Sequence, residues 1–261
     1  MTNFPRRIVC LTEESVETLF AIGEGHRIVG VSAYARRPPE VSSLPVVSAF
    51  LSGHVNKIKG LKPDLVIGFS DIQKDLAKDL IGEGLNVYIA NHRSIDEIFE
   101  YIEMLGNLVD AKEKTAAYIT SLKDKVIEAK KFAKTLVNKP LVYIEEWDEP
   151  MIAGIKWFNE IVELCGGEVV FNESELGPMA KDRYVDSRDV ISKNPDIIFA
   201  CWCGKKVEID SIRNRLGWSE IQAIKNDRVY ELEPEVFLQP GPAPIISGIE
   251  IILNHFKRWR E

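Results

Sequence analysis

The sequence predicts an α/β fold: two lobes with parallel sheets, joined by a single long helix, with a ligand cleft between the lobes. The first observation is a repeat, because the chain reads KPDLVIG at residues 62–68 and NPDIIFA at residues 194–200, about half the chain apart. Each segment is typical of a buried parallel strand that ends at a loop. The second observation is the alternation of strand and helix patterns, and the third is an apolar stripe along one helical segment between the repeats.

In the first half, short apolar runs alternate with amphipathic segments. One helix begins at Thr12, which precedes two glutamates, and ends at Gly23, as expected from capping preferences. Residues 32–45 are rich in proline and arginine, which predicts a loop. The predicted strands are 7–11, 27–31, 64–69 and 86–90, and the predicted helices are 12–22, 52–61, 73–81 and 94–105.

A long helix is predicted over residues 108–134. Its apolar stripe advances in steps of four and three residues and consists of Thr115, Ile119, Leu122, Val126, Ala129 and Ala133. At 1.5 Å per residue the helix would be roughly 40 Å long, which is enough to join two lobes and to restrain hinge bending. We therefore expect an N-terminal lobe at 1–104, a connecting helix at 105–139 and a C-terminal lobe at 140–261.

The second half repeats the plan of the first. Strands are predicted at 141–145, 168–171, 196–200 and 228–232, and helices at 157–165, 187–193, 209–224 and 245–259. Residues 233–244 contain four prolines and one glycine and are predicted to form a loop. Alternation at this spacing predicts a second parallel sheet.

Composition and charge exclude several classes of function. The formal net charge is −7 and the pI is near 5.3, so we expect no nucleic-acid partner. No apolar run is long enough to span a bilayer, so we expect no membrane insertion. We also expect the protein to be a monomer. The chain begins almost directly with a strand and has four cysteines without a disulfide framework, which predicts a cytoplasmic protein. If a leader has been removed, a periplasmic or extracytoplasmic location is the alternative.

The candidate ligand-binding residues follow the predicted strands, where ligands gather in open parallel sheets. Aromatic and charged or polar side chains recur together at these positions, which suits a large flat ligand with polar edges. The candidates are Tyr34, Arg37, Phe50, Phe69, Asp71, Arg93, Glu146, Trp147, Trp157, Trp202, Cys203, Phe237 and Gln239.

Each candidate also has a purely structural interpretation. The three tryptophans of the set could be core aromatics, and Lys205 with Lys206 is typical of an exposed surface pair. In a strand, the spacing of Cys201 and Cys203 would place both thiols on one face, where Cys203 could contact a chelated metal. His92 is the histidine that follows a strand at this edge, and it could contact ligand or metal.

Four segments carry a resemblance to a known family. They are KPDLVIG at 62–68 after a loop helix, ELCGG at 163–167, WCGK at 202–205 and LQPGP at 238–242. Across its whole length the chain resembles the ABC-transporter binding proteins for cobalamin, ferric siderophores or haem, closest to the cobalamin branch. The resemblance implies two Rossmann-like lobes, the helical-backbone metal receptor fold, and corrin stacking by Phe50 and Phe69. It also implies a corrinoid or related metal chelate as ligand, no intrinsic cofactor, and an ABC permease as partner.

No catalytic motif is present in the sequence. We find no nucleophile elbow, phosphate-binding loop, dinucleotide fingerprint or zinc-protease motif, and no histidine pair at metal-binding spacing. We therefore expect a non-enzymatic binding protein without catalytic residues or a metal site. Two alternatives remain open: a cytoplasmic binder or sensor of a smaller polar metabolite, and a hydrolase-like enzyme that uses the carboxylates of Asp71, Glu145 and Asp148.

Overall fold

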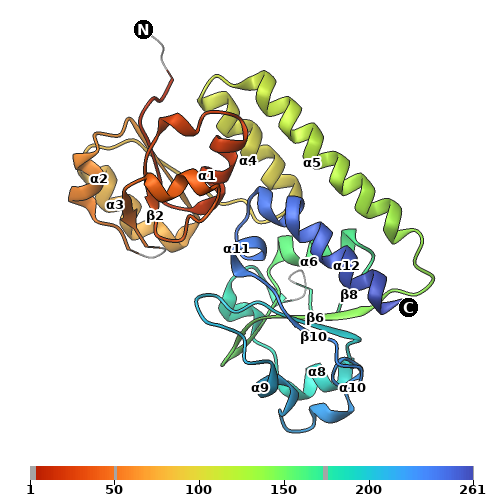
Figure 1. Ribbon diagram of the computed structural model, residues 1–261. Coiled ribbons are helices and arrows are strands. Elements are labelled where there is room, and N and C mark those ends of the chain that lie inside the picture. Colours follow the sequence, from red (N-terminus) through yellow and green to blue (C-terminus); the bar gives the residue numbers. More distant parts are fainter. Residues whose placement is uncertain (1–3, 50–51, 173–175, 261) are drawn as a thin grey trace. The chain divides into compact units, whose positions relative to one another are not determined.

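The computed structural model describes residues 4–49, 52–172 and 176–260, and it confirms two α/β lobes (Figure 1). Unit 1 consists of Met1–Lys123 together with Pro240–Pro242, and unit 2 consists of Asp124–Gln239 together with Ala243–Glu261. Each unit contains a five-stranded sheet.

Sheet A of unit 1 is entirely parallel, in the order β3-β2-β1-β4-β5. Its strands are β1 Ile8–Cys10, β2 Ile28–Ser32, β3 Val46–Ser48, β4 Leu65–Phe69 and β5 Val87–Ala90. The edge strand β3 was not predicted, because its three residues follow a proline-rich loop and are too few for a period to emerge.

Helices cover both faces of sheet A because successive residues of each strand point to opposite faces. Ile8 and Cys10 of β1 pack with α1, α4 and the residues that follow α4. Val9 and Leu11 pack with α2 and α3. The helices of this unit are α1 Glu13–Ala21, η1 Gly25–Arg27, η2 Pro39–Ser43, α2 Val55–Gly60, η3 Asp71–Gln73, α3 Lys74–Gly82 and α4 Ile95–Leu108.

The predicted long helix is α5, Lys112–Ala133, which Figure 1 shows as one continuous helix. It begins later than predicted because α4 ends at Leu108 and the chain turns at Asp110, whose φ is +58°. The stripe positions Thr115, Leu122 and Ala129 are buried, as the pattern predicts. The boundary between the units falls after Lys123, so α5 contributes residues to both of them.

Sheet B of unit 2 is mixed. Its strands are β6 Leu141–Asp148, β7 Met151–Ala153, β8 Glu168–Val169, β9 Ile197–Ala200 and β10 Val229–Glu231. β6 pairs in parallel with β8 and β9, and β9 pairs in parallel with β10. β7 was not predicted: β6 continues to Asp148, turns at once and pairs antiparallel with β7. β7 and β8 therefore occupy successive parts of one side of β6.

Among the described residues of unit 2, the helices are α6 Lys156–Leu164, η4 Ala180–Arg183, α8 Ser187–Lys193, α9 Ile209–Arg213, η5 Trp218–Glu220, α10 Gln222–Lys225, α11 Pro234–Phe237, a π-helical turn η6 Pro244–Gly248, and α12 Ile249–Trp259. The single helix predicted over 209–224 is instead three short helices. Gly217 has φ +82° and breaks the segment so that the whole Trp218 side chain enters the core. The predicted loop 233–244 likewise contains the helical turn α11.

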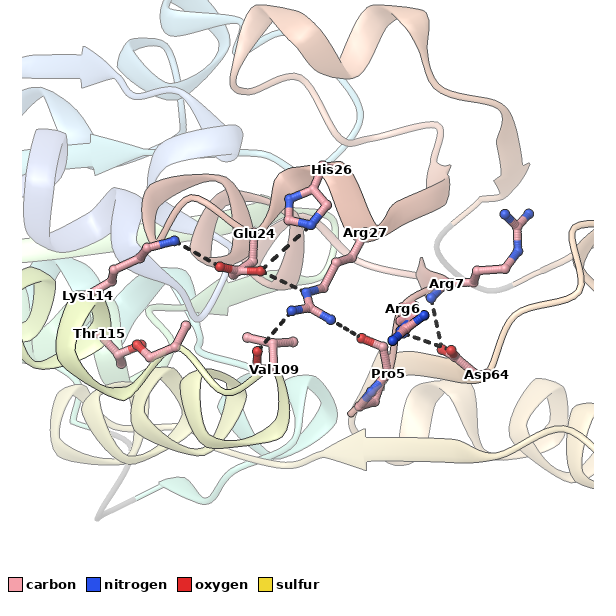
Figure 2. A network of polar contacts seen from close by, with 11 residues as sticks. Pro5, Arg6, Arg7, Glu24, His26, Arg27, Asp64, Val109, Lys114 and Thr115 are labelled. Carbon is pink, nitrogen blue, oxygen red and sulfur yellow. Dashed lines mark hydrogen bonds and ion pairs between the residues drawn. The ribbon is translucent and has the colours of Figure 1, made fainter. Parts of the chain in front are cut away.

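A polar network joins the end of α1 to the start of α5 (Figure 2). Glu24 accepts hydrogen bonds from Arg27 Nε at 2.7 Å and from Lys114 Nζ at 3.0 Å. Arg27 also donates to the carbonyl oxygens of Pro5 at 2.6 Å and Val109 at 3.1 Å. Burial acts to raise the pKa of Glu24, but the bonds from Arg27 and Lys114 outweigh it, so that pKa is lowered. One guanidinium thus links three segments of unit 1.

We expect Arg27→Met to lower the free energy of unfolding of unit 1 by about 2–3 kcal/mol, because charge-assisted hydrogen bonds contribute about 1.5–3 kcal/mol. Chemical denaturation measures the change. Arg36→Met is the matched control, because Arg36 is exposed. Equal effects of the two substitutions would contradict the role given to the Arg27 network.

Candidate functional site

At the carboxyl edge of sheet A, the structure brings together residues from two neighbouring strands. Phe69, the last residue of β4, pairs with Ala90, the last residue of β5. The segments that follow therefore leave the sheet side by side, and Arg93 Nη2 lies 3.2 Å from Asp71 Oδ1. Three predicted residues, Phe69, Asp71 and Arg93, thus lie at one edge of the sheet.

His92 lies at the same edge and is buried. Its ring stacks on Tyr101 of α4, with centroids 4.1 Å apart, and meets Phe69 edge-on at 5.2 Å. His92 Nε2 lies 2.5 Å from the carbonyl oxygen of Pro240. Because a carbonyl can only accept, Nε2 carries the proton and Nδ1 is left as an acceptor. Burial lowers the pKa of His92 to about 4, so the ring is neutral at pH 7.

A buried carboxyl group lies close to the same edge, in the first turn of α1. Glu14 is 1 % exposed, and it accepts a short hydrogen bond from the Thr12 hydroxyl. Burial, assisted by the charge of Glu13, raises the pKa of Glu14 to about 8. Burial and the charge of Glu14 in turn raise the pKa of Tyr101. At neutral pH the Glu14 side chain is therefore mainly protonated.

The remaining candidates of unit 1 are Tyr34, Arg37 and Phe50. Tyr34 is exposed, and Arg37 forms an ion pair with Glu17 of α1 at 2.8 Å. Phe50 lies outside the described residues.

In unit 2 a carboxylate lies at the centre of sheet B. Glu145 of β6 is fully buried and pairs with Ala200 of β9 on one side and Ala153 of β7 on the other. The Arg215 guanidinium donates two hydrogen bonds to this carboxylate, at 2.5 and 2.9 Å. The Tyr143 hydroxyl at 3.1 Å and Trp202 Nε1 at 3.2 Å donate to the same carboxylate. This full set of partners leaves Glu145 no role as a general base in the hydrolase alternative.

Beyond Glu145 and Ala200, two tryptophans lie at matching positions. Trp147 and Trp202 follow these paired residues by two positions each. The ammonium of Lys205 lies 4.2 Å from the Trp147 ring centroid and 4.7 Å from the Trp202 ring centroid. It also donates to Asp148 Oδ1 at 2.5 Å. We call Trp147, Trp202 and Asp148 the indole cage.

The other candidates of unit 2 have structural partners. Glu146 accepts from the backbone of Ile155 and forms an ion pair with the buried Arg183 at 2.9 Å. Trp157 is in the core and donates to the carbonyl of Phe237, which is itself buried. Gln239 Nε2 donates to the carbonyl of Glu235 at 2.8 Å.

The two neighbouring cysteines do not share a face. Cys203 is exposed, whereas Cys201 is buried. The strand β9 ends at Ala200, so the alternation expected for a strand does not apply to them. Within the described ranges, no group of three or more histidine, cysteine, aspartate or glutamate side chains could hold a metal ion.

Sequence reasoning missed Lys205, Arg215 and Glu14. Lys205 was interpreted as half of an exposed pair, although it follows Trp202 by three residues and so could turn back over its ring. Arg215 lies in a segment predicted as one continuous helix. That prediction gave no sign that the Arg215 side chain reaches the Glu145 carboxylate in sheet B. Glu14 has the ordinary appearance of a first-turn acidic residue, and its burial depends on tertiary packing.

The comparisons agree with this architecture. The family model for periplasmic binding proteins matches residues 8–236. An uncharacterized ABC transporter substrate-binding lipoprotein of Bacillus subtilis (strain 168) is 29% identical over 260 residues, covering 94% of this chain and 78% of its own. A vitamin B12-binding protein of Vibrio cholerae serotype O1 is 27% identical over 264 residues, covering 97% and 90%. The crystal structure of a periplasmic vitamin B12 binding protein of Vibrio cholerae has a TM-score of 0.78 and 26% identity, covering 98% of each chain.

The fold and these comparisons define a substrate-binding protein of the type that serves ABC transporters, and not an enzyme, as predicted. The chain belongs to the periplasmic binding protein family. The predicted cytoplasmic location is wrong, because the matched family is periplasmic and the Bacillus relative is a lipoprotein. A strand pattern close to the first residue is weak evidence for the cellular compartment of a protein. In the described residues, no helix combines the length and apolar character needed to cross a membrane.

We expect Arg215→Met to destabilise unit 2 by about 3–5 kcal/mol, because it leaves the Glu145 carboxylate buried without its cation. The double variant Arg215→Met with Glu145→Gln should be more stable than Arg215→Met alone, since the neutral amide needs no counter-ion. Denaturant unfolding of wild type, Arg215→Met, Glu145→Gln and the double variant tests this. A double variant that loses as much as the two single losses combined would contradict the proposed coupling.

The buried Glu14 carboxyl predicts a specific pH dependence. Its pKa is about 8 in the folded protein against 4.5 for an ordinary glutamate, so the stability that it contributes is complete below about pH 4.5 and is lost as pH rises towards 8. Glu14→Gln removes this loss. Between pH 5 and 8 wild type should lose roughly 3.5 kcal/mol that the variant keeps, so the Tm of the variant should rise relative to wild type by roughly 7–14 °C, using 2–4 °C per kcal/mol.

The two neutral histidines do not affect the difference in Tm between Glu14→Gln and wild type. The pKa values of His92 and His255 are lowered by burial to about 4, so their contribution is lost in acid and cancels in the comparison of variant with wild type. Glu113→Gln, an exposed first-turn glutamate of α5, is the control. Parallel pH curves for wild type and Glu14→Gln would show that Glu14 does not titrate in this range.

Proposed function

We propose that this protein binds a corrinoid, vitamin B12 or a close relative, as the substrate-binding component of an ABC transporter. The observation that carries this proposal is the likeness along nearly the whole chain to a vitamin B12-binding protein, at 27% identity over 97% of the chain. The solved vitamin B12-binding structure supports it at 26% identity. The partner that would receive the ligand is an ABC permease, as the description of the Bacillus relative suggests.

The indole cage is the surface that we propose for contact with the corrin ring. Indoles offer large apolar faces, and their N–H groups are already satisfied: Trp147 Nε1 donates to the Glu149 carbonyl at 3.0 Å and Trp202 Nε1 to Glu145. Rings held in this way lose little conformational freedom on binding, which favours affinity. Asp148 at the cage rim can accept hydrogen bonds from amide groups on the ligand edge. Phe69 remains a predicted ring contact at the edge of sheet A.

We expect cyanocobalamin or dicyanocobinamide to bind the purified protein and to change its visible spectrum. A ligand that binds the folded form stabilises it by about 2.7 kcal/mol at one hundred times its Kd, which corresponds to a rise in Tm of about 5–10 °C. Haemin and a ferric hydroxamate siderophore are tested in parallel. A response to one of these alone would reassign the ligand, and no response to any compound would defeat the proposal.

The same titration locates the ring contact. Trp147→Ala should weaken corrinoid binding about tenfold, which is the effect of losing about 1.4 kcal/mol of contact energy. Trp259→Ala is the control, because Trp259 is also partly buried but lies at the end of α12. Equal affinity of the two variants would exclude Trp147 as a contact.

A further inference from the structure

Lys205 fills the indole cage with the chain's own cation. The distances from its ammonium to the two ring centroids, 4.2 and 4.7 Å, are within the range of cation–π attraction. Asp148, whose side chain is 19% exposed, supplies the opposite charge at 2.5 Å. Burial acts to raise the pKa of Asp148, but the hydrogen bond and charge of Lys205 together with backbone hydrogen bonds outweigh it, so that pKa is lowered. Two aromatic faces and a carboxylate around an ammonium group are the composition of a cation-binding cage.

The two indole rings are each fixed by a hydrogen bond from the ring N–H, whereas Lys205 is held only through its flexible side chain. Trp202 is anchored through Glu145, which Arg215 holds by two bonds, and Trp147 is anchored through the Glu149 carbonyl. The Lys205 side chain is 40% exposed. It follows Gly204, which has φ +81° and open space where a Cβ would lie. Rotation of a flexible side chain at a permissive turn can therefore uncover the rings without a change in sheet B.

Lys205 covers the ring faces that a ligand would need. Trp202 belongs to the core cluster of unit 2, against which the half-buried Trp147 packs, and the Lys205 ammonium lies over both rings. A flat ligand cannot stack on these faces while the ammonium occupies them. Both groups need the same indole surface, so their occupation is mutually exclusive.

We propose that Lys205 is a built-in competitor of the ligand: its ammonium occupies the indole cage in the free protein and leaves when the ligand ring stacks on Trp147 and Trp202. This inference rests on the proposed function, because it concerns the regulation of the same site. The competitor keeps two apolar faces out of water in the free protein. It also sets a lower limit on the binding energy of a ligand, because a ligand displaces the ammonium only if it interacts more favourably with the indole rings than the ammonium does.

The test compares Lys205→Met with Lys206→Met. Methionine keeps a flexible apolar chain without the charge, and Lys206 is the adjacent exposed lysine. Titration with dicyanocobinamide, cyanocobalamin and haemin should show three- to tenfold tighter binding by Lys205→Met to the compound that binds wild type, which is the size expected for loss of a cation–π competitor. Lys206→Met should match wild type. Unchanged binding by Lys205→Met would overturn the inference, and weaker binding would show that Lys205 contacts the ligand directly.

A second measurement follows Lys205 itself. In the free protein, acetylation by acetic anhydride, read by peptide mass spectrometry, should be slower at Lys205 than at Lys206. Saturation with the bound compound should make Lys205 react faster. Protection that persists or grows on binding would overturn the inference while leaving the proposed function intact. If no compound binds wild type or Lys205→Met, the proposed function fails and this inference fails with it.

Discussion

Unit 2 depends on the neutralisation of one buried carboxylate. Glu145 lies in the middle strand of sheet B, where an unpaired charge would cost several kcal/mol. Arg215 reaches it from the segment after α9 and stacks on Trp218, and the Tyr143 hydroxyl completes the shell. The same carboxylate orients the Trp202 indole. The group that stabilises the core therefore also sets the orientation of the ring that we assign to the ligand.

The arrangement separates rigid from mobile parts at the edge of sheet B. Backbone pairing of β6 with β9 places Trp147 of β6 and Trp202, two residues beyond the end of β9, at matching positions, and hydrogen bonds from the indole N–H groups hold both rings. Lys205, on the exposed turn after β9, is held by an ion pair and two ring contacts that solvent can replace. Exposed ion pairs contribute little to stability, typically about 0–1 kcal/mol. A contact of this kind can be exchanged for a ligand at small cost.

Much of the fold could be predicted because its strands are short apolar runs with clear boundaries. The repeat located β4 and β9, and the apolar stripe located α5. β3, β7 and the break at Gly217 could not be predicted, since each depends on tertiary pairing or on burial of a large side chain such as Trp218. The site was predicted less completely. Strand ends identified Phe69, Trp147 and Trp202, but the burial of Glu145 and the position of Lys205 follow from register and side-chain direction, which a single sequence does not reveal.

The edge strands of both sheets are short. In sheet A they are β3 and β5, with three and four residues, and in sheet B they are β7 and β10, with three residues each, and β8, with two. Strands of this length present few unpaired backbone groups to a neighbouring molecule. Strand-by-strand addition of a second copy at these edges is therefore disfavoured.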